Sequence, residues 1–294
     1  MLKKFLLALI ACSAITASAS YEYYIESGKY RVKISAIEKH TVRDMVWDRT
    51  AICVGADFYG AVVSPARGIN IGAGQRKPET QEKLLAVKVT CDGKEVTPKQ
   101  NMRIKGNRIV IEKLSMFDKL LFNTQLELTA DGFRESSRFV ATAEQKINLF
   151  YAHIYCFNKA FSEYYALTED DYDITGKFNV PGQKDTWHVN SEVKCLALYD
   201  ESAKKGVLLY YPQVIPGASR NAAIWEKSNT KKFYMMTKLD KVIPANWESR
   251  TYSVVLRCFE AASAKDFPAA AKAAAEAAGK IKLADLPKPE LPKK

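Results

Sequence analysis

The chain has 294 residues, of which 44 are Lys or Arg and 33 are Asp or Glu, so its formal charge is +11. This length suits one large β domain or two small ones. Basic and acidic residues are interleaved, which indicates a solvated basic surface and disfavours nucleic acid as a partner. Attraction to an acidic polysaccharide or an anionic membrane is the second interpretation of this charge.

Residues 1–19 have the pattern of a secretory signal peptide. A short basic start is followed by the apolar run Phe5 to Ala11 and by the small residues Ala17-Ser-Ala19. Cleavage there predicts a secreted or periplasmic protein that begins near Ser20, and the loss of two lysines lowers its formal charge to +9. The apolar run is far below the roughly 20 residues that span a bilayer, and no later segment reaches that length, so no transmembrane segment is expected.

A second interpretation of the N-terminus is a lipid anchor. Leu9-Ile-Ala-Cys12 resembles a bacterial lipobox, in which Cys12 would be acylated. Five cysteines follow it: Cys53, Cys91, Cys156, Cys195 and Cys258. No Cys-x-x-Cys or Cys-His spacing suggests zinc, so neither a metal nor a cofactor is expected. Buried free thiols are the favoured interpretation. One disulfide is the alternative, because the expected compartment is oxidising.

The segment 20–262 has the signals of short strands joined by turns. Tyr30, Val32 and Ile34 alternate with polar residues, which is typical of a half-buried strand. Hairpin turns are predicted at Asp92-Gly93, at 105–108 and at Asp131-Gly132. The glycine-rich segment 64–74 is not followed by a helix, so it indicates a loop or bulge pair rather than a nucleotide cradle.

The strand predicted from Lys146 to Asn158 organises the middle of the chain. Strict alternation places six residues on one side: Ile147, Leu149, Tyr151, His153, Tyr155 and Phe157. The other side is largely apolar too, which predicts a central strand of a sheet. After it, 161–184 is expected to be an irregular acidic and aromatic loop, and Trp187 to Tyr199 returns to a strand.

Only the C-terminus departs from the β pattern. Segment 263–285 contains an N-cap at Asp266, an alanine run from Ala269 to Ala278 and a stop at Gly279, which predicts a peripheral helix. The Lys/Pro-rich end, 286–294, is expected to be disordered.

Roughly fifteen short strands and one helix predict an all-β protein. The expected fold is a large antiparallel two-sheet β-sandwich with one short C-terminal α-helix. Its order of hairpins, a mid-chain strand bearing His153, an irregular loop and a closing strand at 248–259 resembles the galactose mutarotase-like β-supersandwich. That fold is found in aldose epimerases and in domains of polysaccharide-processing enzymes. The resemblance covers about residues 21 to 260 and is one of layout.

The resemblance implies sugar chemistry with a histidine acid and a glutamate base. His153 or His188 would fill the first role, and Glu248 and Glu260 are positional candidates for the second. The residues around the epimerase histidine have no recognisable counterparts in this sequence.

From the residues themselves, the candidate catalytic group is His153 with Tyr151 and Tyr155 beside it. A neutral imidazole between phenols can act as an acid or base near pH 7, with the tyrosines stacking on a sugar or relaying protons. The competing interpretation is a core histidine bonded to a tyrosine.

Two further groups are candidate substrate-binding residues. Arg134, Glu135 and Arg138 would lie near the imidazole if their strand paired with that of His153, and Arg138 would then bind a uronate carboxylate. The second group is Trp187, His188 and Glu192, which lie on one predicted strand. For the arginine group, the alternative is a row of surface ion pairs. For the second group, the alternative is a strand face that is simply exposed to solvent.

These observations lead to two functional hypotheses. The first is an exported protein that binds or processes carbohydrate, by proton transfer at a sugar centre in an epimerase- or lyase-like reaction if it is catalytic. The second is a non-catalytic cell-envelope module for binding or structure. An open cleft around His153 would favour catalysis, and an imidazole sealed under apolar side chains would weigh against it.

Overall fold

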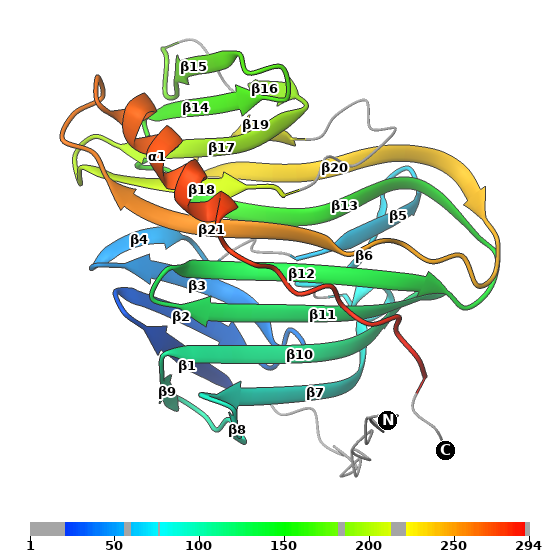
Figure 1. The fold of residues 1–294 in the computed structure, drawn as a ribbon. Helices are drawn as coiled ribbons and strands as arrows, with labels where there is room; N and C mark the ends of the chain where they lie inside the picture. Colours follow the sequence, from blue (N-terminus) through cyan, green and yellow to red (C-terminus); the bar gives the residue numbers. More distant parts are fainter. Residues whose placement is uncertain (1–20, 56–59, 76, 182–185, 213–221, 292–294) are drawn as a thin grey trace, which may run out of the picture.

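The structure is a computed structural model that describes residues 21–55, 60–75, 77–181, 186–212 and 222–291. Two large β-sheets are stacked face to face (Figure 1). The predicted signal segment 1–19, including Cys12, lies outside the described residues, so export and lipidation stay predictions. None of the described helices is long and apolar enough to cross a membrane.

Sheet I has 11 strands. Its main path runs in the spatial order β16 (Trp187–Ser191), β19 (Ala222–Glu226), β20 (Thr230–Ile243), β13 (Gln145–Asn158), β4 (Thr50–Cys53), β3 (Thr41–Trp47), β2 (Tyr30–Ser35), β1 (Glu22–Ser27) and β9 (Arg103–Lys105). A hairpin of β5 (Val62–Ala66) and β6 (Ile69–Gly72) also pairs with β13.

Sheet II has 10 strands. Their spatial order is β15 (Asp173–Lys177), β14 (Glu163–Thr168), β17 (Val193–Asp200), β18 (Lys205–Tyr210), β21 (Tyr252–Glu260), β12 (Gly132–Ala141), β11 (Leu120–Thr129), β10 (Arg108–Phe117), β7 (Lys83–Cys91) and β8 (Lys94–Glu95). All paired strands of the two sheets are antiparallel except β1 and β9. The predicted two-sheet, all-β fold is confirmed.

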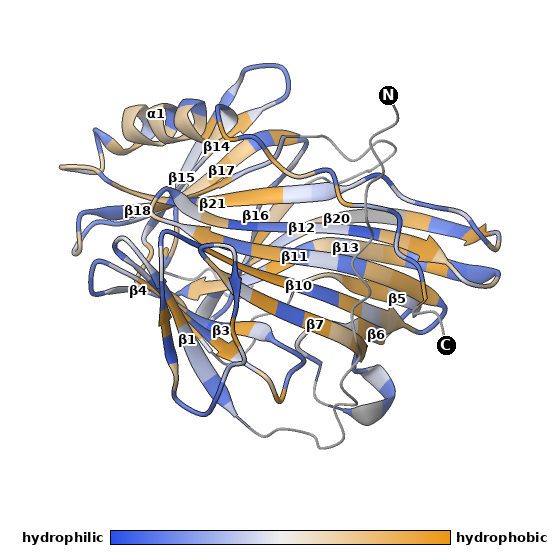
Figure 2. Ribbon diagram, turned by 60° about the horizontal axis from the view of Figure 1, so that its bottom comes forward, coloured by the Kyte–Doolittle hydropathy of each residue, from blue (hydrophilic) through white to orange (hydrophobic). Residues whose placement is uncertain are grey.

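The core lies between the sheets and is built from alternate residues of each strand. Leu126 and Leu128 of β11 alternate with polar residues and are buried. Phe122 stacks on Phe117 at 4.3 Å and on Phe139 at 4.9 Å between ring centroids. Figure 2 shows hydrophobic and hydrophilic residues alternating along strands such as β10, with hydrophilic turns at the strand ends. Burial of this apolar surface drives the two sheets together.

The turn predictions are confirmed in two places and wrong in a third. Asp92 and Gly93 have φ angles of 49° and 80° and join β7 to β8, and Gly132 begins β12 directly after the β11 turn. Segment 105–108 is not a hairpin, because β9 pairs with β1 of sheet I while β10 enters sheet II. The Asp92 carboxylate accepts hydrogen bonds from the backbone amides of Asn107 and Arg108 at this crossing.

Segment 161–184 is more regular than predicted. Among its described residues, β14 and β15 form an antiparallel hairpin at the edge of sheet II. Asp173, one of the acidic residues expected to lie in a loop, accepts a hydrogen bond from Tyr165 at 2.8 Å. No disulfide joins the cysteines of the described chain, and four of the five are buried.

The C-terminus covers the outer face of sheet II. Helix α1 (Phe267–Gly279) forms where the alanine run predicts it and packs on β17, β18 and β21. The chain then crosses β12 and β11 (Figure 1). Here the expectation of disorder does not hold for 286–288, because Leu286 is buried and its carbonyl accepts a hydrogen bond from Arg138 at 2.8 Å. Composition did not reveal that sheet II supplies partners for this segment.

Candidate functional site

The strand β13 carries two bulges that decide where its side chains point. Its pairing with β20 shifts register between Ile147 and Leu149 and again between Tyr151 and His153. Each bulge moves the following residues to the opposite face. Leu149 and Tyr151 therefore pack with Ile154 on the outer face of sheet I, whereas Tyr155 lies in the core. The prediction that Tyr151, His153 and Tyr155 share one face is wrong.

Between the sheets, Glu135 of β12 lies beside Tyr155 and His153. The Tyr155 hydroxyl donates a hydrogen bond to Glu135 Oε2, and His153 Nδ1 is 3.6 Å from the same oxygen, too far for a hydrogen bond. Burial, and then the Glu135 charge, raise the pKa of Tyr155 well above its usual value. Both ring nitrogens of His153 lack a hydrogen-bond partner among the described residues, and the side chain is 0% exposed.

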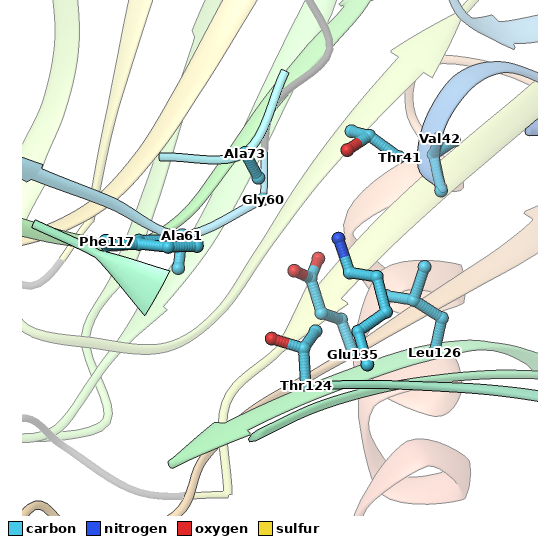
Figure 3. A pocket seen from close by; sticks show the side chains of 10 residues that line it. Thr41, Val42, Gly60, Ala61, Ala73, Phe117, Thr124, Leu126 and Glu135 are labelled. Atoms are coloured by element: carbon cyan, nitrogen blue, oxygen red, sulfur yellow. The ribbon is translucent and has the colours of Figure 1, made fainter. Parts of the chain in front are cut away.

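A narrow pocket lies beside Glu135, between residues of the two sheets. In Figure 3, Glu135 and Thr124 of sheet II face Gly60, Ala61 and Thr41 across it. A Cβ atom at Gly60 would lie 2.5 Å from Glu135 Oε1, so a larger residue there would require the Glu135 carboxylate to shift.

Lys113, also in the pocket wall, is committed to partners. Its ammonium donates to Glu82 Oε1 at 2.8 Å and to the Lys39 carbonyl at 2.9 Å. Nearby, His40 Nδ1 is 2.9 Å from the Tyr23 hydroxyl. Burial, and then the charges of Lys113 and Lys39, lower the pKa of His40 to about 4. His40 is therefore neutral near pH 7 and is a buried structural group.

His188 belongs to a second buried cluster. His188 follows the outward-facing Trp187 and points inward, where Nε2 is 2.7 Å from Glu226 Oε2. A bulge between His188 and Asn190, with Val189 at a φ of 50°, then leaves Asn190 exposed. Lys231 donates to Glu226 Oε1 at 2.7 Å. Burial alone would raise the pKa of Glu226, but hydrogen bonds from Lys231, the Asn179 amide and His188 outweigh it and lower that pKa. The cluster is therefore a buried ion pair of Glu226 and Lys231 that also binds His188.

The outer face of sheet I directly above this cluster carries a row of four aromatic rings. Trp187 stacks on Trp225 at 5.3 Å and 7°, and its ring is 5.4 Å from that of Tyr234. Tyr234 is in turn 5.5 Å from Tyr151. Trp187 is 43% exposed. We call these residues, Trp187, Trp225, Tyr234 and Tyr151, the aromatic row.

Sequence alternation connects the aromatic row to the buried network. Trp187 precedes His188, and Trp225 precedes Glu226, so one member of each pair faces out and the next faces in. The cross-strand pairs Trp187↔Trp225 and Glu226↔Lys231 hold the two layers in register. The network behind the sheet thus fixes the backbone that presents the rings.

The predicted arginines lie away from His153. Strand β12 pairs with β11 and β21 rather than with β13, so only its inward residue Glu135 reaches the imidazole. Arg134 pairs with Glu127, and Arg138 pairs with Glu248 at 3.3 Å on the opposite face. The expected arginine clamp beside the imidazole is therefore wrong.

The positional candidates Glu248 and Glu260 are also distant from it. Glu248 joins Arg138 on the outer face of sheet II, and Glu260 pairs with Lys29 at 3.2 Å. Glu192 is exposed after the end of β16. No group of His, Cys, Asp and Glu that could hold a metal ion occurs within the described part of the chain.

Of the predicted binding residues, Trp187 is the one with an exposed aromatic surface. Trp225 and Tyr234 were missed, because their strands were not singled out as ligand-bearing. The available signal was Trp225 and Tyr234 in two short alternating segments separated by a turn at 227–230. Pairing these segments would have placed the rings side by side.

No protein-family model and no curated protein matches the sequence. Among solved structures, the fold is similar to α-N-acetylgalactosaminidase NagBb from Bifidobacterium bifidum, with a TM-score of 0.52 and 9% identity over 87% of this chain and 39% of that one. A galactose mutarotase-like protein from Clostridium acetobutylicum gives a TM-score of 0.45 and 10% identity over 81% and 94% of the two chains.

The GH36 α-galactosidase AgaA from Geobacillus stearothermophilus gives a TM-score of 0.42 and 11% identity, over 82% of this chain and 41% of that one. The predicted resemblance to the galactose mutarotase-like β-supersandwich is confirmed as a resemblance of fold at low identity.

Proposed function

We propose that this protein binds carbohydrate on the outer face of sheet I, with the aromatic row as its platform. The observation that carries the proposal is the half-exposed Trp187, stacked on Trp225 and continued by Tyr234. The C–H face of a pyranose is apolar and flat, so it gains by covering an indole ring, while its hydroxyls remain in water. Sheet residues and the buried network hold the rings in place before a ligand arrives.

The fold neighbours give weaker support for the same carbohydrate-binding proposal. NagBb and AgaA are named for activities on galactose-type sugars, and a shared fold raises the expectation of a sugar ligand without transferring an activity.

The sequence-based alternative, proton transfer by His153, has less support. A histidine that is 0% exposed cannot contact a sugar in this conformation, and Tyr151 lies on the other face of the strand. Tyr155 donates a hydrogen bond to Glu135, but His153 is too far from that carboxylate for a hydrogen bond, and the pocket beside them is narrow. We therefore propose binding as the function, and not proton transfer at His153.

The binding proposal is tested on a glycan array with the protein purified from residue 20 onward. Trp187→Ala is expected to weaken every positive signal by about tenfold or more, as loss of a central aromatic contact does. Tyr172→Ala is the matched control, because Tyr172 is 71% exposed in the β14–β15 turn. A Trp187→Ala variant that is folded and binds like the wild type would overturn the proposal, and so would the absence of any glycan signal.

We also propose that the protein is exported through residues 1–19. The support is the basic, apolar and small-residue order of that segment. Intact-mass measurement of the protein from a bacterial envelope fraction distinguishes plain cleavage near Ser20 from acylation at Cys12. A mass that retains Met1 would contradict export.

A further inference from the structure

The aromatic row is flanked by positive charge. Lys227, in the turn between β19 and β20, places its ammonium 4.1 Å from the centroid of the Trp225 ring. That turn is closed by a hydrogen bond from the Lys227 amide to the Thr230 carbonyl at 2.9 Å. Lys232 places its ammonium 5.6 Å from the centroid of Tyr234. Two cations therefore border the rings on which a sugar would stack.

The acidic residue closest in sequence faces the other way. Glu226 points to the interior, where Lys231 and His188 bind its two oxygens. Within the described residues of β16, β19 and the first half of β20, every outward-facing formal charge is a lysine. No described carboxylate lies within 4.0 Å of the Lys227 ammonium. Among the described residues of these strands, the formal charge beside the aromatic row is therefore positive.

We infer that the ligand of the aromatic row is an anionic glycan, with its carboxylate bound by Lys227 and its sugar ring on Trp187. This inference rests on the proposed binding function and specifies its ligand class. A lysine ammonium is a compact point charge with three donors, so it selects for negative charge without demanding the planar fork geometry of arginine. The net positive charge of the chain adds long-range attraction to a polyanion.

The probes are hexagalacturonate, its methyl ester and a neutral hexasaccharide of glucose, each titrated calorimetrically into the wild-type protein. The uronate is expected to bind more tightly than the ester, and raising the salt from 20 to 300 mM is expected to reduce that preference, because exposed charges are screened. Lys227→Met should weaken uronate binding by about fivefold and ester binding by less, and Lys227→Arg should retain most of the uronate affinity. Lys94→Met, an exposed lysine at the far edge of sheet II, is the matched control.

Failure of this inference differs from failure of the binding proposal. If the ester and the uronate bind equally, and Lys227→Met changes neither while Trp187→Ala removes both, the site is a neutral-sugar site and the inference is overturned alone. If no probe binds the wild type, or Trp187→Ala has no effect, both proposals are overturned. The comparison of the two ligands on the wild type does not depend on the folding of any variant.

Discussion

The two outer faces of this sandwich differ in how far the chain itself covers them. On sheet II, helix α1 and the tail cover the strands, and Phe267, Ala271 and Ala278 are buried against them. On sheet I, Trp187 of the aromatic row is 43% exposed, Trp225 and Tyr151 are partly buried, and Tyr234 is 7% exposed. A sheet face covered by its own chain serves stability, whereas an aromatic face left at the surface is available to a ligand. Four changes test this division, from the largest expected effect to the smallest.

Phe267→Ala removes the anchor of the cover over sheet II. Phe267 stacks on Tyr199 at 5.0 Å and is 1% exposed, so we expect a loss of about 4 kcal/mol in the free energy of unfolding. Urea denaturation measures it. Trp187→Ala, on the other face, should cost less than about 1 kcal/mol. Equal costs for the two variants would contradict the division.

Glu226→Ala removes the carboxylate that binds His188 and Lys231 behind the aromatic row. It leaves the ammonium of Lys231 buried with only Asn179 as a side-chain partner, so we expect a loss of about 3 kcal/mol and weaker glycan binding together. The double variant Glu226→Gln with Lys231→Met removes both charges and should recover most of the stability in the same denaturation experiment. A single variant as stable as the wild type would show that the network does not support the rings.

Acid should lower the free energy of unfolding by protonating the buried His40. His40 faces Tyr23, Tyr21, Lys113 and Lys39, and its folded pKa of about 4 is below its ordinary value of 6.5. The unfolded chain therefore takes up the proton first. Stability is complete above about pH 6.5 and falls by about 3 kcal/mol as the pH drops to about 4.

Denaturation of the wild type and His40→Gln across this range measures the difference, since both share the carboxylate titrations. Parallel stability curves for the two proteins would rule out this role for His40.

Leu286→Ala loosens the tail on sheet II. The Leu286 amide donates to Thr251 Oγ1 at 3.0 Å in addition to the bond between its carbonyl and Arg138, so part of the attachment survives. We expect a loss of between about 1 and 2 kcal/mol and faster hydrogen exchange at 285–288. Glycan binding should not change. Altered binding would mean that the tail influences the opposite face.

Much of the fold could be predicted from local patterns. The alternation of Leu126 and Leu128, the Asp92-Gly93 turn and the helix over the alanine run are each encoded within a few residues. The crossing at 105–108 could not be predicted, because a parallel pairing with β1 depends on a distant segment. The attachment of Leu286 depends in the same way on residues more than a hundred positions earlier.

The candidate site was predicted only in part, and β13 shows why. Its sequence alternates without interruption, yet two bulges send Tyr151 to the outer face and leave His153 and Tyr155 inside. A bulge is set by the pairing partner, which the sequence of one strand does not contain. Trp187 was identified from its own strand, but Trp225 and Tyr234 join it only through pairing with β19 and β20.

By itself, the sequence determined the all-β class, the C-terminal helix and the basic character of the chain, because periodicity, caps and charge are local properties. Tertiary structure alone decided which side chains meet. It placed Glu135 beside His153, turned Glu226 inward to Lys231 and lined up four rings from four strands. Register and sheet order set these contacts, and both arise from packing between segments far apart in the chain.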